Sequence, residues 1–101
     1  MKITMLFRAW YPFEVSELQL ELIKHFLPSR LYTEVADLSY NFKIQLEGAK
    51  AVNPWKVLER IKEKFDSEGK PFPSFTITNI EVENEEEKDK LATWILESKL
   101  S

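Results

Sequence analysis

His25 is the only histidine in the chain, and there are no cysteines. Histidine is the most common general acid–base catalyst, and protein zinc sites are built mainly from histidine and cysteine. One histidine without cysteine therefore supports no metal cluster and at most one triad-type site. His25 lies beside Phe26 in an apolar-rich segment, where a partly exposed helix residue is the more ordinary interpretation.

Glycine-dependent nucleotide sites are also missing from the sequence. Gly48 and Gly69 are its only glycines, and two isolated glycines cannot form a phosphate-binding loop or a dinucleotide fingerprint. Carboxylate pairs can always be drawn among 17 acidic residues, so they carry no specific signal. We therefore predict no catalytic residues, no cofactor and no metal, and favour a binding protein over an enzyme. The alternative, an enzyme acting through His25 or carboxylates, would require a concave pocket.

The densest charge feature is an acidic run near the C-terminus, comprising Glu81, Glu83, Glu85, Glu86, Glu87 and Asp89. Such a run could bind a divalent cation or a basic partner. A solvated strand end followed by the first turn of a helix explains the same residues, because the helix dipole favours negative charge there. We favour this second interpretation.

Lys56, Arg60 and Lys64 recur at every fourth position, which would align them as a basic stripe along one helix face. Such a stripe could follow the phosphates of a nucleic acid. Glu59 and Glu63 lie among these cations, however, and a lattice of ion pairs along the helix is the more ordinary explanation.

The composition indicates one small α+β domain covering residues 1–101 and limits its partners. The formal net charge of −3 argues against a general nucleic-acid-binding surface. No apolar run approaches the roughly 20 residues that span a bilayer. The N-terminus carries no recognisable signal peptide, so we expect no membrane association.

Residue usage also suggests where the protein works. The absence of cysteine fits a reducing compartment, and we expect a cytoplasmic location. With 14 Glu, 11 Lys and only two Gln, the chain is typical of hyperthermophile proteins, which predicts a thermophilic microbial or archaeal source.

The clearest structural signal is unbroken alternation of apolar and polar residues from Leu38 to Glu47. A period of two places the apolar side chains on one face of a strand, and a slip of one residue would turn all of them toward water. The apolar members are Leu38, Tyr40, Phe42, Ile44 and Leu46. We predict a strand that is held in a sheet with one covered face.

Three further strands are predicted, at Lys2 to Tyr11, Leu31 to Ala36 and Ser74 to Glu83. The apolar residues of the last strand change faces near Asn79, which predicts a bulge or bend. The second strand is expected to form a hairpin with Leu38–Glu47. One long bent strand from Leu31 to Glu47 is the alternative, because no Asn-Gly or Asp-Gly turn separates the two.

Three helices are predicted from their N-cap residues, starting at Ser16, Asn53 and Asn84. Gln19 and Glu87 would complete capping boxes for the first and last of these helices. The helices are expected to end near Leu27, before Gly69 and near Lys99. In the first helix we expect Leu18, Leu22, Ile23 and Phe26 to face the core and Glu17, Gln19, Glu21 and Lys24 to face solvent.

The element order is β-α-β-β-α-β-α, which predicts a two-layer, ferredoxin-like arrangement with an additional C-terminal helix. If the hairpin is absent, a three-stranded α/β layer remains. In the ferredoxin-like topology the first and third strands are central. Their faces away from the helices would display the candidate interaction surface, composed of Leu6, Arg8, Trp10 and Lys43.

Leu6 and Trp10 would form a sticky patch on that face, so either the C-terminal helix or a second subunit must cover them. The leading functional hypothesis is therefore a small, non-enzymatic protein-interaction module that self-associates through the open sheet face or a sheet edge, as a homodimer or with another protein. The alternative is an accessory RNA or single-stranded DNA binder. It would use Arg8, Trp10 and Lys43 with the basic stripe, although the third strand shows no outward aromatic for base stacking.

Overall fold

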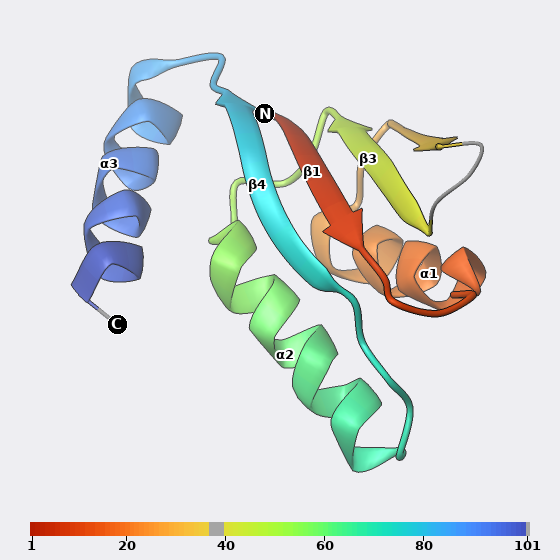
Figure 1. The fold of residues 1–101 in the computed structure, drawn as a ribbon. Coiled ribbons are helices and arrows are strands. Elements are labelled where there is room, and N and C mark those ends of the chain that lie inside the picture. The colour runs from red at the N-terminus through yellow and green to blue at the C-terminus, as the bar shows by residue number, and fades with distance from the viewer. Residues whose placement is uncertain (37–39, 101) are drawn as a thin grey trace.

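The computed structural model describes residues 1–36 and 40–100. Its elements are β1 (Lys2–Arg8), α1 (Val15–Phe26), β2 (Arg30–Val35), β3 (Asn41–Glu47), α2 (Pro54–Ser67), β4 (Ser74–Glu81) and α3 (Glu85–Leu100). The strands form one open antiparallel sheet in the order β2-β3-β1-β4. Helices α1 and α2 cover one face of the sheet (Figure 1). The predicted α+β class is confirmed.

The predicted hairpin is confirmed, because β2 pairs antiparallel with β3 from Arg30 opposite Glu47 to Val35 opposite Phe42. The third strand is shorter than predicted and begins at Asn41. Tyr40 is exposed and lies outside the strand, and Leu38 falls outside the described residues. The buried face of β3 is therefore formed by Phe42, Ile44 and Leu46.

Strand β1 lies between β3 and β4, and Ile3, Met5 and Phe7 are completely buried. The strand ends at Arg8, so its predicted extension to Tyr11 was wrong. The chain leaves the sheet here to bring Phe13 onto the core. The Phe13 ring stacks on Phe42 with a centroid distance of 5.8 Å.

Strand β4 contains the predicted bulge, because its register against β1 shifts between Thr4 and Met5. Thr4 lies opposite Asn79 while Met5 lies opposite Ile77, which leaves Thr78 as the additional residue. The bulge lets both halves of β4 direct isoleucines toward the core, and Ile77 and Ile80 pack against it.

Helix α1 departs from the predicted capping. It begins at Val15, and its N-cap residue Glu14 makes no side-chain capping bond, so the Ser16 capping box was wrong. The Gln19 amide instead donates to Thr33 Oγ1 of β2 at 2.6 Å. Two assigned faces were also wrong: Ile23 is exposed, and Glu21 is buried.

Helix α2 follows its prediction closely. Asn53 Oδ1 accepts hydrogen bonds from the backbone N–H groups of Trp55 at 3.1 Å and Lys56 at 3.4 Å. The apolar side of the helix is buried and comprises Val57, Leu58, Ile61 and Phe65. Gly69 follows the helix with a φ of +69°, a conformation that glycine adopts without strain.

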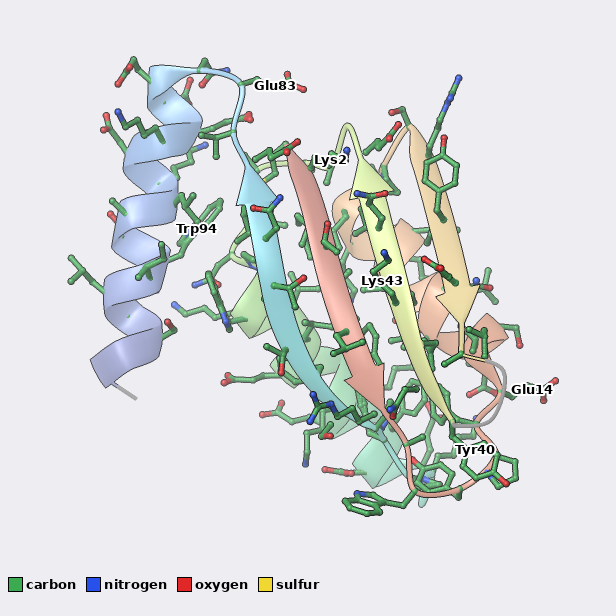
Figure 2. All side chains as sticks on the ribbon, turned by 45° about the horizontal axis from the view of Figure 1, so that its top comes forward. Lys2, Glu14, Tyr40, Lys43, Glu83 and Trp94 are labelled. Carbon is green, nitrogen blue, oxygen red and sulfur yellow. The ribbon has the colours of Figure 1, made fainter. Side chains whose placement is uncertain are left out.

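Helix α3 lies beyond the β4 edge of the sheet and leaves the sheet face opposite α1 and α2, the open face, uncovered (Figure 2). Trp94 points from α3 toward β4 and is only 9% exposed. Asn84 Oδ1 accepts from Glu87 N–H at 2.9 Å, but the Glu87 carboxylate accepts from Glu83 N–H. The second capping box is therefore half formed. Among the described residues, no helix is long and apolar enough to cross a membrane.

Candidate protein-interaction surface

The open face brings together three of the four residues predicted for the candidate interaction surface. Leu6 lies directly opposite Lys43 of β3 and Thr76 of β4. Arg8 follows on the same face of β1, two residues after Leu6. Lys43 (Figure 2) pairs with Glu34 of β2 at 3.2 Å. This surface is polar around one partly buried leucine.

Trp10 stands apart from these residues. It lies two positions past the end of β1, and 92% of its side-chain surface is exposed. Because Trp10 lies outside β1, strand alternation does not place it beside Leu6. The predicted apolar patch of Leu6 and Trp10 is therefore not formed on the open face. Of the two covers expected for this face, the C-terminal helix does not provide one, since α3 lies outside the β4 edge (Figure 2).

The basic stripe of α2 is largely neutralised. Lys56 Nζ lies 3.3 Å from the Glu97 carboxylate of α3, and Lys64 bonds to Glu21 of α1. Arg60 is exposed. These contacts run between elements as well as along the helix, and they reduce the positive charge available to a phosphate backbone.

The histidine and members of the acidic run also contact neighbouring charged groups. His25 Nε2 lies 3.8 Å from the Glu21 carboxylate, one helical turn away. In the acidic run, Glu87 contacts the N-terminal ammonium group of Met1 at 3.4 Å, and Glu86 pairs with Lys90. Within residues 1–36 and 40–100, no group of three or more His, Asp or Glu side chains is placed to hold a metal ion.

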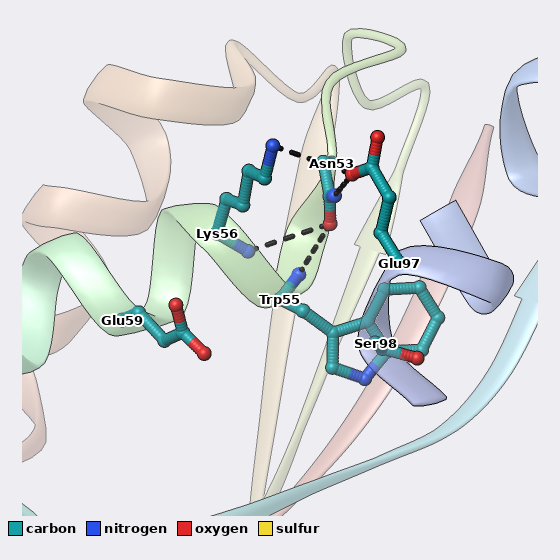
Figure 3. Close-up of a pocket in the computed structure, with 6 residues that line it drawn as sticks. All are labelled: Asn53, Trp55, Lys56, Glu59, Glu97 and Ser98. Carbon is teal, nitrogen blue, oxygen red and sulfur yellow. Dashed lines mark hydrogen bonds and ion pairs between the residues drawn. The ribbon is translucent and has the colours of Figure 1, made fainter. Parts of the chain in front are cut away.

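One polar pocket lies between the N-terminus of α2 and α3 (Figure 3). The Asn53 amide donates to Glu97 at 3.3 Å, and Lys56 pairs with the same carboxylate. The remaining lining residues are Trp55, Glu59 and Ser98. Asn53, Lys56 and Glu97 thus bond to one another and connect the two helices.

A second pocket is lined by Tyr11, Phe13, Phe65 and Pro71, among others. The Tyr11 hydroxyl is buried and has no hydrogen-bond partner among the described residues. Burial raises the pKa of Tyr11 above its ordinary value of 10.0. The phenol is therefore neutral near pH 7 and is not an activated nucleophile.

The two edges of the sheet differ in their protection. The β4 edge carries the bulge and has α3 beside it. The β2 edge keeps a regular register along all six of its residues, and no described element lies beyond it (Figure 2). Its side chains on the helix-covered face are Leu31, Thr33 and Val35, none of them charged.

An apolar stripe on α1 adjoins this edge and was not predicted from the sequence. It consists of Leu20 and Ile23 of α1 and Leu27, the C-cap residue that directly follows the helix, and these are 57%, 44% and 66% exposed. Ile23 lies one turn after Gln19, whose amide contacts β2, while Glu21 contacts α2 on the opposite side of the helix. Ile23 therefore borders the β2 edge, whereas Leu20 lies farther round the helix and also lines a pocket with Lys64 and Phe65 of α2.

The spacing of the stripe, i, i+3 and i+7, was a usable sequence signal. It was hidden because Leu18, Leu22 and Phe26 form a second apolar face on the same helix, and that face is completely buried.

No protein-family model matches the chain, and neither the curated proteins nor the solved structures include a significant match. Since no relative guides the choice, the interaction surface that we consider further, the β2 edge with the α1 stripe, is chosen from the structure of this chain alone.

Proposed function

We propose that this chain is a small, non-enzymatic interaction module that self-associates through the β2 edge and the α1 stripe. The observation that carries the proposal is the regular, uncovered β2 edge. Free backbone N–H and C=O groups along such an edge can pair with a strand of another chain.

The contrast between the edges supports this choice. Proteins commonly prevent edge pairing with bulges, prolines, inward-pointing charges or a covering element. The β4 edge has a bulge and a helix beside it, whereas β2 has uncharged Leu31, Thr33 and Val35 on its helix-covered face. Strand pairing would supply main-chain hydrogen bonds, and the neighbouring stripe would add apolar burial.

Size-exclusion chromatography with light scattering between about 1 µM and 1 mM tests the proposal. The paired substitution Leu20→Gln and Ile23→Gln should shift the dimer toward monomer, because it removes apolar area beside the edge. Leu96→Gln is the matched control, since Leu96 is also an exposed leucine on a helix. Circular dichroism checks that each variant is folded. A wild-type monomer over the whole range, or equal weakening by the control, would overturn the proposal.

Nucleic-acid binding is the second candidate function, supported by the nearly full exposure of Trp10 and by Arg8 at the end of β1. We rank it lower because Lys43, Lys56 and Lys64 are engaged with carboxylates. Fluorescence anisotropy with labelled single-stranded RNA and DNA at low salt tests it. Binding should weaken steeply with salt and fall on Trp10→Ala substitution; undetectable binding at low salt would exclude this function.

We further propose that the fold belongs to the ferredoxin-like class. Both β1 and β2 run antiparallel to β3, and both β3 and β4 run antiparallel to β1. Each strand–helix–strand unit therefore joins two parallel strands with a third strand between them, which is the split βαβ arrangement. An experimental structure with a different strand order would exclude this assignment.

A cytoplasmic location and a thermophilic, archaeal source remain proposals, supported by the missing cysteines and the abundance of Lys and Glu. Shared ion pairs fit the second: Lys70 contacts both Glu17 and Glu68. A thermal unfolding midpoint in the range of mesophilic domains, about 45–65 °C, would argue against a thermophilic source.

A further inference from the structure

The hydrogen-bond alternation of β2 determines which of its groups face outward. Ala36 N–H donates to Asn41 C=O at 3.1 Å, in line with the register that pairs Val35 with Phe42. In an antiparallel ladder, residues alternate between bonding to one neighbouring strand and facing the other side. The N–H and C=O groups of Leu31, Thr33 and Val35 therefore face the free edge.

A two-fold symmetric β2–β2 contact must pair these outward groups with their copies in the second chain, which limits the registers. A register centred on Tyr32 places Arg30 opposite Glu34 of the second copy, twice, with Tyr32 opposite its own copy. Shifting the centre to Thr33 places Glu34 opposite Tyr32, and shifting it to Glu34 places two carboxylates opposite each other. Opposite charges directly across two strands stabilise the pair, and like charges destabilise it.

We propose that β2 of a second copy of this chain pairs antiparallel with β2 of the first copy, in the register centred on Tyr32. Two Arg30–Glu34 pairs then lie across the interface. This inference rests on the proposed self-association. The charge pattern of the edge is complementary to itself only in this register. The resulting sheet is continuous through both copies.

The α1 stripe is placed to support the same contact. Gln19 contacts Thr33, and α1 runs antiparallel to β2, so Ile23 lies near the level of Leu31. A two-fold axis at Tyr32 would therefore bring the Ile23 side chains of the two copies toward each other on the covered side of the sheet.

Engineered cysteines test the register directly, because the chain has no native cysteine to compete. Tyr32 would form a pair without hydrogen bonds, whose Cα atoms are about 4.5 Å apart, within the range that a disulfide spans. Under mild oxidation we expect Tyr32→Cys to link to itself. Arg30→Cys and Glu34→Cys alone should not, but an equimolar mixture of these two variants should.

Charge exchange provides a second, independent test. Arg30→Glu alone and Glu34→Arg alone each place like charges opposite each other, and each should raise the dimer dissociation constant roughly tenfold or more. A mixture of the two variants, or the double substitution in one chain, restores opposite charges and should recover wild-type dimerisation.

The outcomes separate the register from the proposed function. If the wild-type chain stays monomeric, both proposals fail. If it dimerises but Tyr32→Cys links only to Glu34→Cys, the register is centred on Thr33, and the present inference is wrong while the β2 interface stands. If it dimerises without cross-links at any of these positions and charge exchange has no effect, the second copy does not pair at β2.

Discussion

The Glu21 carboxylate of α1 accepts a hydrogen bond from Lys64 Nζ of α2 at 2.5 Å, and only 10% of the Glu21 side chain is exposed. The same carboxylate lies 3.5 Å from Lys24 Nζ. Two residues that are 43 positions apart thus join the two helices on the covered side of the sheet. A buried carboxylate without such a cation would carry an uncompensated desolvation cost.

Replacing Glu21 by Gln should therefore lower the free energy of unfolding by about 1–3 kcal/mol, because the bond to Lys64 loses its charge. Glu59→Gln is the control, since Glu59 is an exposed glutamate on α2. Its effect should stay within about 0.5 kcal/mol. Urea unfolding of both variants measures the difference; equal losses would show that the Glu21–Lys64 contact contributes nothing specific.

The same pair predicts a dependence of stability on pH. The hydrogen bond from Lys64 holds the pKa of Glu21 below its ordinary value of 4.5. Because this pKa is lower in the folded state, the stabilisation is complete above about pH 4.5 and is lost as the pH falls through the folded pKa. The stability difference between wild type and Glu21→Gln should be constant from about pH 6 to 8 and should shrink under acid. A constant difference down to pH 3 would contradict this prediction.

Local signals in the sequence predicted α2 and β3, while contacts between distant residues determined what could not be predicted. Asn53-Pro54 specifies a helix start within a few residues, and the alternation from Asn41 to Glu47 specifies one strand face. Glu21 is buried because Lys64 reaches it from another helix. No pattern within α1 records that contact.

The candidate site shows the same limit. Leu6, Arg8 and Lys43 share the predicted face because strand alternation is local. The predicted topology already implied that β2 lies at an edge, because its first and third strands are central. The sequence could not show that α3 lies beside β4 and leaves the β2 edge uncovered. Trp10 was misplaced because β1 ends at Arg8, after which the chain turns so that Phe13 packs on Phe42.

The two glycines offer a matched test of backbone strain against side-chain overlap. Both adopt positive φ, +64° at Gly48 and +69° at Gly69, but a Cβ at Gly48 would overlap Ser29 Oγ, while one at Gly69 meets open space. Gly69→Ala should cost about 1–2 kcal/mol from strain alone. Gly48→Ala should cost more, because Ser29 Oγ must give up its bond to Glu47 C=O.

Chemical denaturation of the two variants measures both costs. Adding Ser29→Ala to Gly48→Ala should recover part of the loss, since it removes the hydroxyl that overlaps the new methyl group. No recovery would mean that strain accounts for the whole effect at Gly48.

The cap of α2 can be tested without disturbing the core. Asn53→Ala should destabilise the protein by about 1 kcal/mol, because the N–H groups of Trp55 and Lys56 lose their acceptor. Asn53→Ser keeps an acceptor for the helix N–H groups but loses the bond to Glu97. The destabilisation that remains in the serine variant therefore measures the link to α3. If alanine and serine cost the same, the contact with Glu97 rather than the cap provides the stabilisation.

Trp94 should determine whether α3 stays docked beside the sheet. Among the residues of α3 whose burial is described, it alone is buried in the core. Weaker support comes from partly buried Leu91, from Glu87 at the Met1 ammonium group and from Glu97 at α2. Because α3 contributes no strand, its release leaves the β-sheet intact. Trp94→Ala should therefore increase amide hydrogen exchange throughout α3 while exchange in β1 changes little.

Leu96→Ala is the control on the same helix, since Leu96 is 62% exposed. If α3 and β1 lose protection together, α3 unfolds with the whole domain, and Trp94 belongs to the cooperative core rather than to a separate contact.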